Sequence, residues 1–495
     1  MRHVPMMKFL RSRRRSTRGK LFAAVMLCLY GCAVGCAVGC TAGPRYVRPT
    51  IDVPAQYKEM GPWKTAEPSD AIQKGKWWEI YEDPELNAME EQIDVSNLTL
   101  KAAEDQFLQA RAAVRISRSA QYPTVTGGLS VSPARVSANR PLANKTSGTY
   151  NTDLVIPVDV SYEADVWGRV RRTVEASRAE AQASAADVAT VSLTLHAELA
   201  LDYFQLRGLD AQLELLNSTI TAFEKALELT QTRHNAGLSS ALDVTQAQTQ
   251  LETTRAQAQD LGVARAAFEH AIAVLIGKAP SGLSLPQVPL KVPPPAIPLG
   301  LPSNLLERRP DIASSERRVQ EANARIGVAR AAYYPLVTLT GSAGLESTAI
   351  GTLVQGPSIL WSLGASASQI LFDAGRRHAI SEQAWAAYDQ SVASYRQTVL
   401  NALEDVEDNL AALRVLEGEA KTQSQAVDAA EHSLSLSTTL YKGGLTNYLQ
   451  VITAQSTALT NERTAVDLLT RRMQASVLLV KAIGGGWNIS QIPKM

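Results

Sequence analysis

Apolar residues recur at helical spacing along most of the chain. In the first half they form a near-heptad seam, with members three or four residues apart: Leu199, Tyr203, Leu206, Leu209, Leu213, Leu216, Ile220, Phe223 and Leu227. No proline interrupts residues 168–235 or residues 375–441. The pattern therefore predicts one long helix over each of these ranges. At 1.5 Å per residue each helix would be on the order of 100 Å long.

The long helices are expected to end at glycine corners and to continue into partner helices. Gly237 and Gly444 mark the two corners, and the partner helices are predicted over 241–276 and 448–483. Two further helices are predicted over 83–120 and 303–332. The first opens with Asp83 as N-cap and Pro84 at the first helical position. A proline-rich connector over 280–302, expected to be extended, separates the halves.

Four segments alternate with period two instead. They cover 122–136, 150–165, 334–346 and 358–372, and each sets apolar residues against polar ones. Half-buried strands of soluble proteins and outer-membrane strands share this alternation. The flanking helices have no other sheet to pack on, and this context favours outer-membrane strands. Four strands cannot close a barrel, and open edges are not tolerated in lipid, so three copies sharing twelve strands are expected.

The second half of the chain repeats the first. Gly237 and Gly444 lie 207 residues apart, and the same offset relates Gly168-Arg169 to Gly375-Arg376 and Gly277 to Gly484. The Tyr-Pro pairs at 122–123 and 334–335 correspond at an offset of 212. Such repeats are too long to be units of a solenoid, and they indicate a duplicated structural half.

The N-terminus reads as an export signal. Residues 1–20 hold eight basic residues and no acidic one, and an apolar run over 21–39 follows. A transmembrane anchor is the alternative, but glycines interrupt the run and small residues end it. We therefore expect a signal peptide over 1–39.

All four cysteines lie in or next to this segment, at positions 28, 32, 36 and 40. A metal site on one helical face is one interpretation of their spacing. The interpretation we favour is a lipobox, in which Cys40 carries an S-diacylglycerol and an N-acyl chain such as palmitate. Cys32 and Cys36 are the alternatives, and Cys40 is preferred because an extended arm with Gly43-Pro44 follows it. No other cofactor, no metal and no disulfide are expected.

Composition excludes two classes of function. Without the eight basic residues of the signal, 41 basic residues face 48 acidic ones, a net charge near −7 that argues against nucleic acid as a partner. The six histidines form no metalloprotease-type pair, and there is no phosphate loop or nucleophile elbow. An enzyme is not expected. A coiled-coil periplasmic scaffold lipoprotein would explain the long helices but not the four strands.

Several short motifs follow one another in order: Gly-Pro-Arg-Tyr-Val-Arg-Pro at 43–49, Lys-Trp-Trp-Glu at 76–79, Asp-Pro-Glu-Leu at 83–86, Tyr-Glu-Ala-Asp at 162–165, Trp-Gly-Arg at 167–169, Leu-Leu-Glu-Arg-Arg-Pro-Asp-Ile at 305–312, Ile-Gly-Val-Ala-Arg at 326–330 and Gly-Gly-Gly-Trp at 484–487. Each motif alone is weak. Together and in this order, from Cys40 to Trp487, the chain resembles the TolC-type outer-membrane factors, in the lipoprotein branch that includes OprM and is often labelled NodT.

This resemblance implies a fold and a function. The fold would be an α+β membrane protein: a homotrimer with one shared twelve-stranded outer-membrane β-barrel, continuous with a long periplasmic α-helical barrel. The function would be passive conduction of substrates, most simply small molecules or drugs, in a tripartite efflux system. The partners would be a periplasmic adaptor (membrane fusion) protein, an inner-membrane pump and outer-membrane lipid. Conduction of proteins in type I secretion is the alternative.

The resemblance also implies two sets of site residues. The glycine corners match the family's periplasmic tips, where contact with the adaptor is expected at Arg233, Gly237, Leu238, Ser240, Leu242, Asp243, Tyr441, Gly444, Leu445, Asn447, Leu449 and Val451. Simple helix caps would use some of the same residues. The second set is a periplasmic gate, for which the comparable residues are Leu436, Glu431, Asp428 and Leu229.

The expected organisation of the chain follows from these elements. Residues 1–39 are the signal peptide and 40–82 the lipidated arm and equatorial segment. Residues 83–279 and 303–486 are the two repeats, joined by the connector over 280–302 and followed by a tail over 487–495. The mature protein is expected in the outer membrane, lipid-anchored, with a periplasmic extension.

Overall fold

The computed structural model describes residues 41–60, 76–139, 141, 148, 150–297 and 302–495. The expected signal peptide and Cys40 lie outside the described residues, as do parts of the arm, of the first strand pair and of the connector. Within the part of the chain that is described, no helix has an apolar stretch long enough to cross a membrane.

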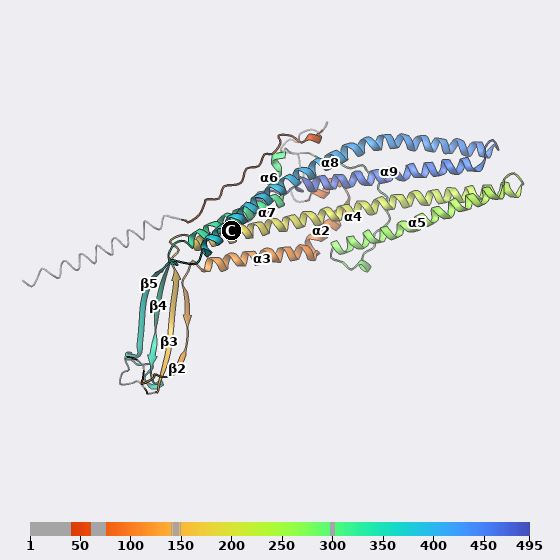
Figure 1. The fold of residues 1–495 in the computed structure, drawn as a ribbon. Coiled ribbons are helices and arrows are strands. Elements are labelled where there is room, and N and C mark those ends of the chain that lie inside the picture. The colour runs from red at the N-terminus through yellow and green to blue at the C-terminus, as the bar shows by residue number, and fades with distance from the viewer. Residues whose placement is uncertain (1–40, 61–75, 140, 142–147, 149, 298–301) are drawn as a thin grey trace, which may run out of the picture. The chain divides into compact units, whose positions relative to one another are not determined.

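The chain folds into two compact units that are not the two sequence repeats. Of the described residues, those within 41–48, 111–180 and 319–391 form one unit, here called the strand unit. Those within 49–110, 181–318 and 392–495 form the other, the hairpin unit. Each unit therefore draws on both halves of the sequence. Four helices contribute residues to both units, and Figure 1 shows the elements with their labels.

The strand unit contains one antiparallel sheet. Its strands are β1 (Thr124–Gly127), β2 (Ser130–Arg135), β3 (Tyr150–Glu163), β4 (Leu336–Ser347) and β5 (Ile359–Ser368). β1 and β2 both pair with β3 in one continuous register, from Thr124 opposite Ser161 to Arg135 opposite Tyr150. β3 pairs with β4, and β4 with β5. The sheet is thus four strands wide, and within it β5 and the β1–β2 line are edges.

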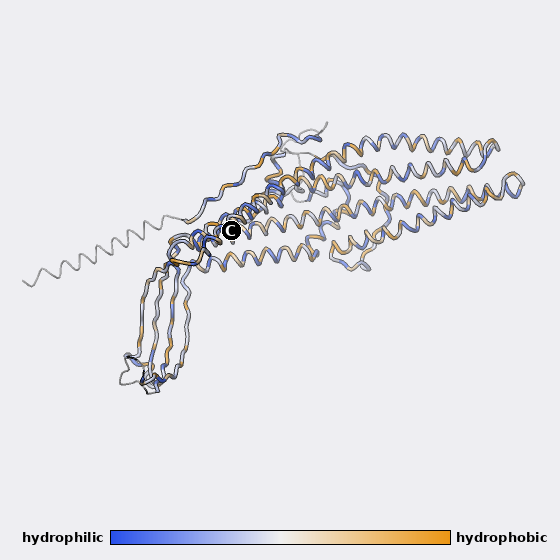
Figure 2. The backbone as a smooth tube through the Cα atoms, in the orientation of Figure 1, coloured by the Kyte–Doolittle hydropathy of each residue, from blue (hydrophilic) through white to orange (hydrophobic). Residues whose placement is uncertain are grey.

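The register places most of the apolar positions of the strands on one face. Val160 lies opposite Val125 on one side and Gly341 on the other, and Gly341 lies opposite Leu363. The other face carries mainly Ser, Thr, Gly and acidic residues, with Val155, Leu336 and Leu360 among them. In Figure 2 hydrophobic and hydrophilic residues both occur along the strands. Large side chains on the apolar face are exposed, including Trp361 at 73% and Leu363 at 82%. No described element of the chain covers this face.

The break between β1 and β2 is a difference from the single strand expected over 122–136. It lies opposite Pro157 of β3, which has no N–H to donate to a ladder. The Gly128 N–H still donates to the Pro157 carbonyl oxygen at 3.1 Å, so the register continues across the break. On the other side of Pro157, a Cβ on Gly344 would lie 2.2 Å from the Ile156 carbonyl oxygen, so only glycine fits there.

The two long helices are α4 (Arg169–Asn235) and α8 (Arg376–Lys442), each of 67 residues. An aspartate caps the start of each one. Asp165 accepts the backbone N–H groups of Val170 and Arg171, and Asp373 accepts those of Gly375 and Arg377. These carboxylates satisfy helix donors that would otherwise have no partner.

The remaining helices differ in two places from the expected single segments. The segment expected over 83–120 is α2 (Pro84–Ser96) and α3 (Leu98–Ser119), and that over 303–332 is a short turn α6 (Leu305–Arg308) followed by α7 (Pro310–Ala331). Asn97 causes the first break, because its side chain caps Leu100 and donates to the Leu275 carbonyl oxygen at 2.7 Å. Pro310 causes the second, since a proline favours the start of a new helix.

The partner helices complete the hairpin unit. They are α5 (Ala241–Leu275) and α9 (Tyr448–Ala482), of 35 residues each. α5 follows the corner of α4, and α9 follows the corner of α8. The two hairpins therefore have equal lengths, and small side chains such as Gly208, whose Cβ position would overlap Thr470, allow close approach of α4 to α9.

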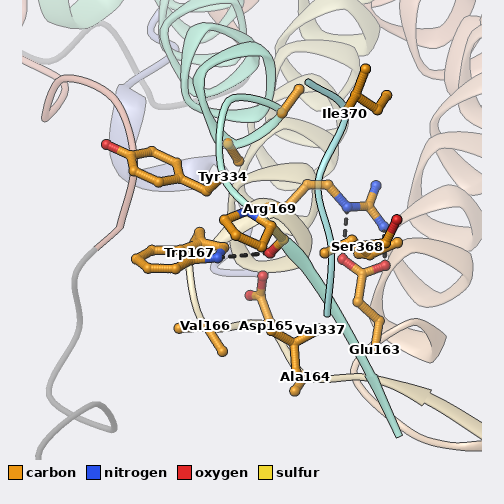
Figure 3. A pocket seen from close by; sticks show the side chains of 14 residues that line it. Glu163, Ala164, Asp165, Val166, Trp167, Arg169, Tyr334, Val337, Ser368 and Ile370 are labelled. Carbon is orange, nitrogen blue, oxygen red and sulfur yellow. Dashed lines mark hydrogen bonds and ion pairs between the residues drawn. The ribbon is translucent and has the colours of Figure 1, made fainter. Parts of the chain in front are cut away.

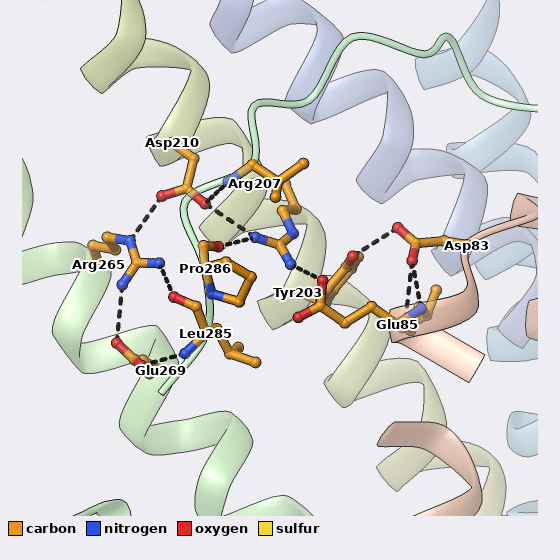
Figure 4. A network of polar contacts seen from close by, with 11 residues as sticks. Asp83, Glu85, Tyr203, Arg207, Asp210, Arg265, Glu269, Leu285 and Pro286 are labelled. Carbon is orange, nitrogen blue, oxygen red and sulfur yellow. Dashed lines mark hydrogen bonds and ion pairs between the residues drawn. The ribbon is translucent and has the colours of Figure 1, made fainter. Parts of the chain in front are cut away.

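A buried polar network fastens the connector to the first hairpin (Figure 4). Arg207 of α4 is 3% exposed and donates to Asp210, to Glu85 and to the Pro286 carbonyl oxygen. Arg265 of α5 donates to Asp210 and to the Leu285 carbonyl oxygen. The proline-rich segment is thus held by charge-assisted hydrogen bonds.

The N-terminal arm is held by the second hairpin in a related way. The backbone N–H groups of Lys58 and Glu59 donate to the Glu407 carboxylate at 2.7 and 2.9 Å, and Arg414 pairs with Glu59 at 2.5 Å. Arg414 lies 207 residues after Arg207 and is its equivalent in the repeat. Each long helix therefore uses an arginine at the same repeat position to fasten a crossing segment.

Replacing Arg207 with Ala is expected to destabilise the hairpin unit. The change leaves the buried Asp210 carboxylate without one of its partners, at a cost of about 3–5 kcal/mol. We expect a clear drop in the midpoint of thermal unfolding, followed by circular dichroism. Arg255→Ala is the matched control, because this half-exposed arginine pairs with Glu224 and Glu252 at the surface and its loss costs about 1 kcal/mol or less. Equal midpoints for the two variants would contradict this account of the network.

Candidate functional site: the tips of the two helical hairpins

The two hairpin corners are built in the same way. Gly237 and Gly444 adopt φ values of 75° and 73°, a region that favours glycine. In each corner, one N–H donates to the carbonyl five residues back, from Leu238 to Arg233 and from Leu445 to Leu440. These bonds form a Schellman ending, which turns the chain sharply and closes the carbonyl end of the helix.

The helices that follow the corners begin with side-chain caps. Ser240 and Asp243 form a reciprocal capping box at the start of α5. Asn447 accepts the Gln450 N–H at the start of α9. His234 donates from Nδ1 to the Ser239 carbonyl oxygen at 2.9 Å and ties the first corner together. Several residues predicted as contact sites therefore also hold the corners in shape.

A small core joins the two hairpins just behind the corners. Tyr441, Tyr448, Val451 and Ala247 are buried together, with Leu227 and Ile452 packed against them. The Tyr441 and Tyr448 rings lie 5.2 Å apart. Burial raises the pKa of the Tyr448 hydroxyl to about 12, and the neighbouring Tyr441 adds to the shift. The tips of the two hairpins are thus held side by side.

Arg233 crosses from the first hairpin to the second. Its guanidinium lies 4.9 Å from the centre of the Tyr441 ring and donates to the Lys442 carbonyl oxygen at 3.2 Å. A cation over an aromatic face is worth about 0.5–2 kcal/mol, more when it is shielded from water. Arg233 therefore contributes to the joint between the hairpins.

The predicted contact residues fall into two groups in the structure. Leu238, Leu242, Leu445 and Leu449 are between 52% and 78% exposed at the corners, together with Gly237, Ser240, Gly444 and Asn447. Tyr441 and Val451 are buried and join the hairpins, and Arg233 and Asp243 are intermediate. Four exposed leucines on two adjacent corners form an apolar surface, here called the tip surface, which is suited to docking another apolar surface.

Sequence reasoning did not single out Tyr448 or Ala247. The sequence predicts Tyr448 only as the first residue of the helix over 448–483, yet Tyr448 is 2% exposed and central to the core between the hairpins. A signal was present, because Tyr441 and Tyr448 stand seven residues apart on either side of Gly444. Aromatic residues that flank a tight corner at this spacing come together once the chain reverses.

The predicted gate residues lie on the sides of the helices above the corners. Leu436 is 51% exposed, Asp428 and Glu431 are exposed, and Leu229 of α4 is half-buried. Glu431 faces Glu462 of α9, whose carboxyl pKa is raised by burial and by this like-charged neighbour. The side chains of Asp428, Glu431 and Leu436 therefore lie at the surface of the hairpin unit and not in its core.

A second candidate is a cavity of roughly 310 Å³ at the junction of sheet and helices in the strand unit (Figure 3). Its polar groups satisfy one another: Glu163 pairs with Arg169, and the Trp167 Nε1–H donates to the Pro335 carbonyl oxygen at 2.9 Å. Trp167 also stacks on Tyr334 at 4.7 Å. These contacts hold the strand ends to the helix starts.

The chain matches a known protein family and is similar to known outer-membrane proteins over most of its length. Residues 91–278 and 301–485 match the family model described as outer membrane efflux protein. The chain is 31% identical over 452 residues to the outer membrane protein OprJ of Pseudomonas aeruginosa, covering 90% of this chain and 92% of that one. It is 32% identical over 463 residues to the toluene efflux pump outer membrane protein TtgF of Pseudomonas putida, covering 91% and 95%.

The fold has solved counterparts as well. The outer-membrane channel OprN superimposes with a TM-score of 0.84 at 28% identity, covering 90% of this chain and the whole of that one. The similarity thus extends over both units.

Truncating Tyr441 is expected to loosen the tips. Tyr441→Ala removes a buried aromatic side chain, at a cost of about 3 kcal/mol or more, and should raise the population of opened tips roughly a hundredfold. The measurement is the rate of tryptic cleavage after Lys442, at the end of α8. Leu238→Ala, a truncation of a 67% exposed side chain on the other corner, should leave this rate within about twofold. Unchanged cleavage in Tyr441→Ala would show that the core between the hairpins does not hold the tips.

Proposed function

This chain belongs to the outer membrane efflux protein family, and from that premise we propose that it is the outer-membrane channel of a tripartite efflux system. It conducts substrates passively from an inner-membrane pump and a periplasmic adaptor out of the cell. Small molecules are the favoured cargo, because curated relatives such as TtgF are named as parts of toluene efflux pumps. Conduction of secreted proteins is the alternative.

The two-faced sheet carries this proposal. One face of the sheet is mostly apolar and exposed, the other is mostly polar, and the outer strands β5 and β1–β2 present unpaired backbone groups within one chain. Apolar surface facing outward suits lipid, but unpaired edge groups are costly there. Three copies that pair edge to edge would close a twelve-stranded barrel, with the polar face lining the lumen.

The long hairpins supply the periplasmic part of the proposed channel. α4 and α8 each span about 100 Å at 1.5 Å per residue. With α5 and α9 and the shorter helices, three copies would form a helical barrel in which the two halves of each chain alternate. The arm at 57–59 and the connector at 285–290 would contribute to a belt around it. This arrangement would account for the duplication within the sequence.

The start of the described chain supports a lipid anchor at Cys40. The Ala42 N–H donates to the Trp167 carbonyl oxygen at 2.9 Å, and Arg172 donates to the carbonyl oxygens of Ala42 and Pro44. A Cβ on Gly43 would lie 2.5 Å from Gly327, so the arm is closely seated. The residues directly after Cys40 are thus bound where the strands end and α4 begins. An S-diacylglycerol and an N-acyl chain on Cys40 would enter the membrane beside the sheet.

The trimer and its gate can be tested by mass in detergent and by single-channel conductance in a planar bilayer. We expect a trimer with small, rarely open currents, which increase when Leu436, Asp428 and Glu431 are replaced with Ala or Ser. Glu419→Ala is the matched control: this exposed acid of α8 lies nine residues before Asp428, on the opposite side of the helix. A monomer without conductance would refute the shared channel. A trimer whose currents ignore the three replacements would refute the gate residues alone.

The tip surface is proposed to dock the adaptor's helical ends. Replacing Leu238 and Leu445 with Ser removes exposed apolar area from both corners and should weaken capture of the adaptor at least tenfold while the trimer remains intact. Val263→Ser on α5, a residue that is 72% exposed and about six turns from the corner, is the control. Binding can be followed by cross-linking to the purified adaptor. An unchanged yield with both leucines replaced would locate the docking surface elsewhere.

A further inference from the structure

A buried acid–histidine cluster lies in the hairpin unit away from the tips. His196 of α4 is 3% exposed. Its Nδ1 lies 2.7 Å from Glu90 Oε2, and its Nε2 lies 3.2 Å from Asp94 Oδ1. The ring of Trp78, just before α2, stacks on the imidazole at 4.4 Å. Histidine, two carboxyl groups and an indole thus join the segment from Trp78 to Asp94 to the long helix.

One oxygen of the cluster lacks a partner. Glu90 is fully buried and its Oε1 makes no hydrogen bond within the described residues, nor does the buried Trp78 Nε1–H. An ionised carboxylate with an unpaired buried oxygen is costly, whereas a proton on that oxygen removes the charge. Burial accordingly raises the pKa of Glu90 to about 7, although the hydrogen bond to His196 opposes the shift.

The histidine is shifted in the same direction. Burial alone would lower its pKa, but the hydrogen bonds to Asp94 and Glu90 outweigh burial and raise the pKa of His196 to about 9. The pKa of Asp94 is lowered, chiefly by its hydrogen bond to His196. The charged groups that face the cluster are Glu90 and Asp94 from α2 and Lys76 from the segment before it, and Lys76 also pairs with Glu91.

We propose that these side chains form a proton-operated clasp, which holds residues 77–96 most firmly against α4 in mildly acidic medium and loosens step by step as the medium becomes neutral and then alkaline. The two protonated groups allow Trp78 and α2 to pack on α4 without an unpaired buried charge. Loss of the Glu90 proton places a carboxylate oxygen without a partner in the interior. Loss of the second proton from His196 then leaves the carboxylates of Glu90 and Asp94 without a cation between them.

The direction of the pH dependence follows from both groups. A carboxyl whose folded pKa is above its unfolded value of 4.5 loses stability as pH rises from 4.5 to about 7. A histidine raised to about 9 contributes stability that is complete below 6.5 and is lost as pH rises through 9. From these shifts, the opening equilibrium of the segment should rise about two-hundredfold between pH 6 and 8, with about tenfold from Glu90 and about twentyfold from His196. Between pH 8 and 10 it should rise about tenfold again, from His196 alone.

Hydrogen exchange of the full-length protein in detergent tests the clasp. The observable is the protection of peptides from α2 (Pro84–Ser96), corrected at each pH for intrinsic exchange. Wild-type protection should fall through both intervals. Glu90→Gln keeps the size and a hydrogen-bonding group but cannot titrate, so the fall between pH 6 and 8 should become about tenfold smaller, while the fall between pH 8 and 10, which comes from His196, remains.

The control variant is a neighbouring acid that lies outside the cluster. Glu91→Gln removes an exposed carboxylate from the same helix and should leave the two-step profile unchanged. Wild-type protection that is the same at pH 6 and pH 10 overturns the clasp without use of any variant. A fall between pH 6 and 8 that is as large in Glu90→Gln as in the wild type also overturns it. Since the readout is local protection, the test does not depend on whether the protein conducts substrates.

Discussion

A buried arginine on a long helix, holding a chain segment that crosses it, is the interaction on which the arrangement of the hairpin unit depends. The long helices are only weakly amphipathic, and helices of 67 residues need contacts along their length to stay together. Arg207 supplies such a contact for the connector through Asp210 and the Pro286 carbonyl oxygen. Arg414, at the same repeat position, pairs with Glu59 of the arm, but this arginine is 48% exposed and the contact lies at the surface. Loss of Arg207 would weaken the attachment of the connector to α4 and leave Arg265 of α5 to hold it.

The two units have different roles in the proposed channel. The strand unit is a sheet with one mostly apolar and one mostly polar face, and the edges of this sheet need partners. In the hairpin unit, the helices are joined at a small aromatic core, and leucines are exposed at the corners. The family match shows that such chains are outer membrane efflux proteins. The exposed sheet face and the tip surface indicate where this chain would meet lipid and adaptor.

The pattern of the sequence predicted much of this, and its misses have physical causes. Period-two alternation predicted the strands and the residues that share a face, because the side-chain period of a strand is set by its backbone. The alternation missed the break between β1 and β2. The break is caused by Pro157 of the neighbouring strand β3, and the sequence of the broken segment does not reveal which residue it pairs with. The helix break at Asn97 was missed for a similar reason: the amide side chain bonds to Leu275, a residue 178 positions away.

The sequence by itself determined the long helices, the glycine corners, the strand faces and the duplication, because each depends on local spacing and on residues with restricted backbone angles. The tertiary structure alone decided which tip residues are surface and which are core. Tyr441 and Leu445 looked equivalent along the chain, yet Tyr441 packs against Tyr448 and Arg233 while Leu445 is 78% exposed. Only the structure joined Glu90 to His196, since burial and charge pairing arise between helices that are distant in sequence.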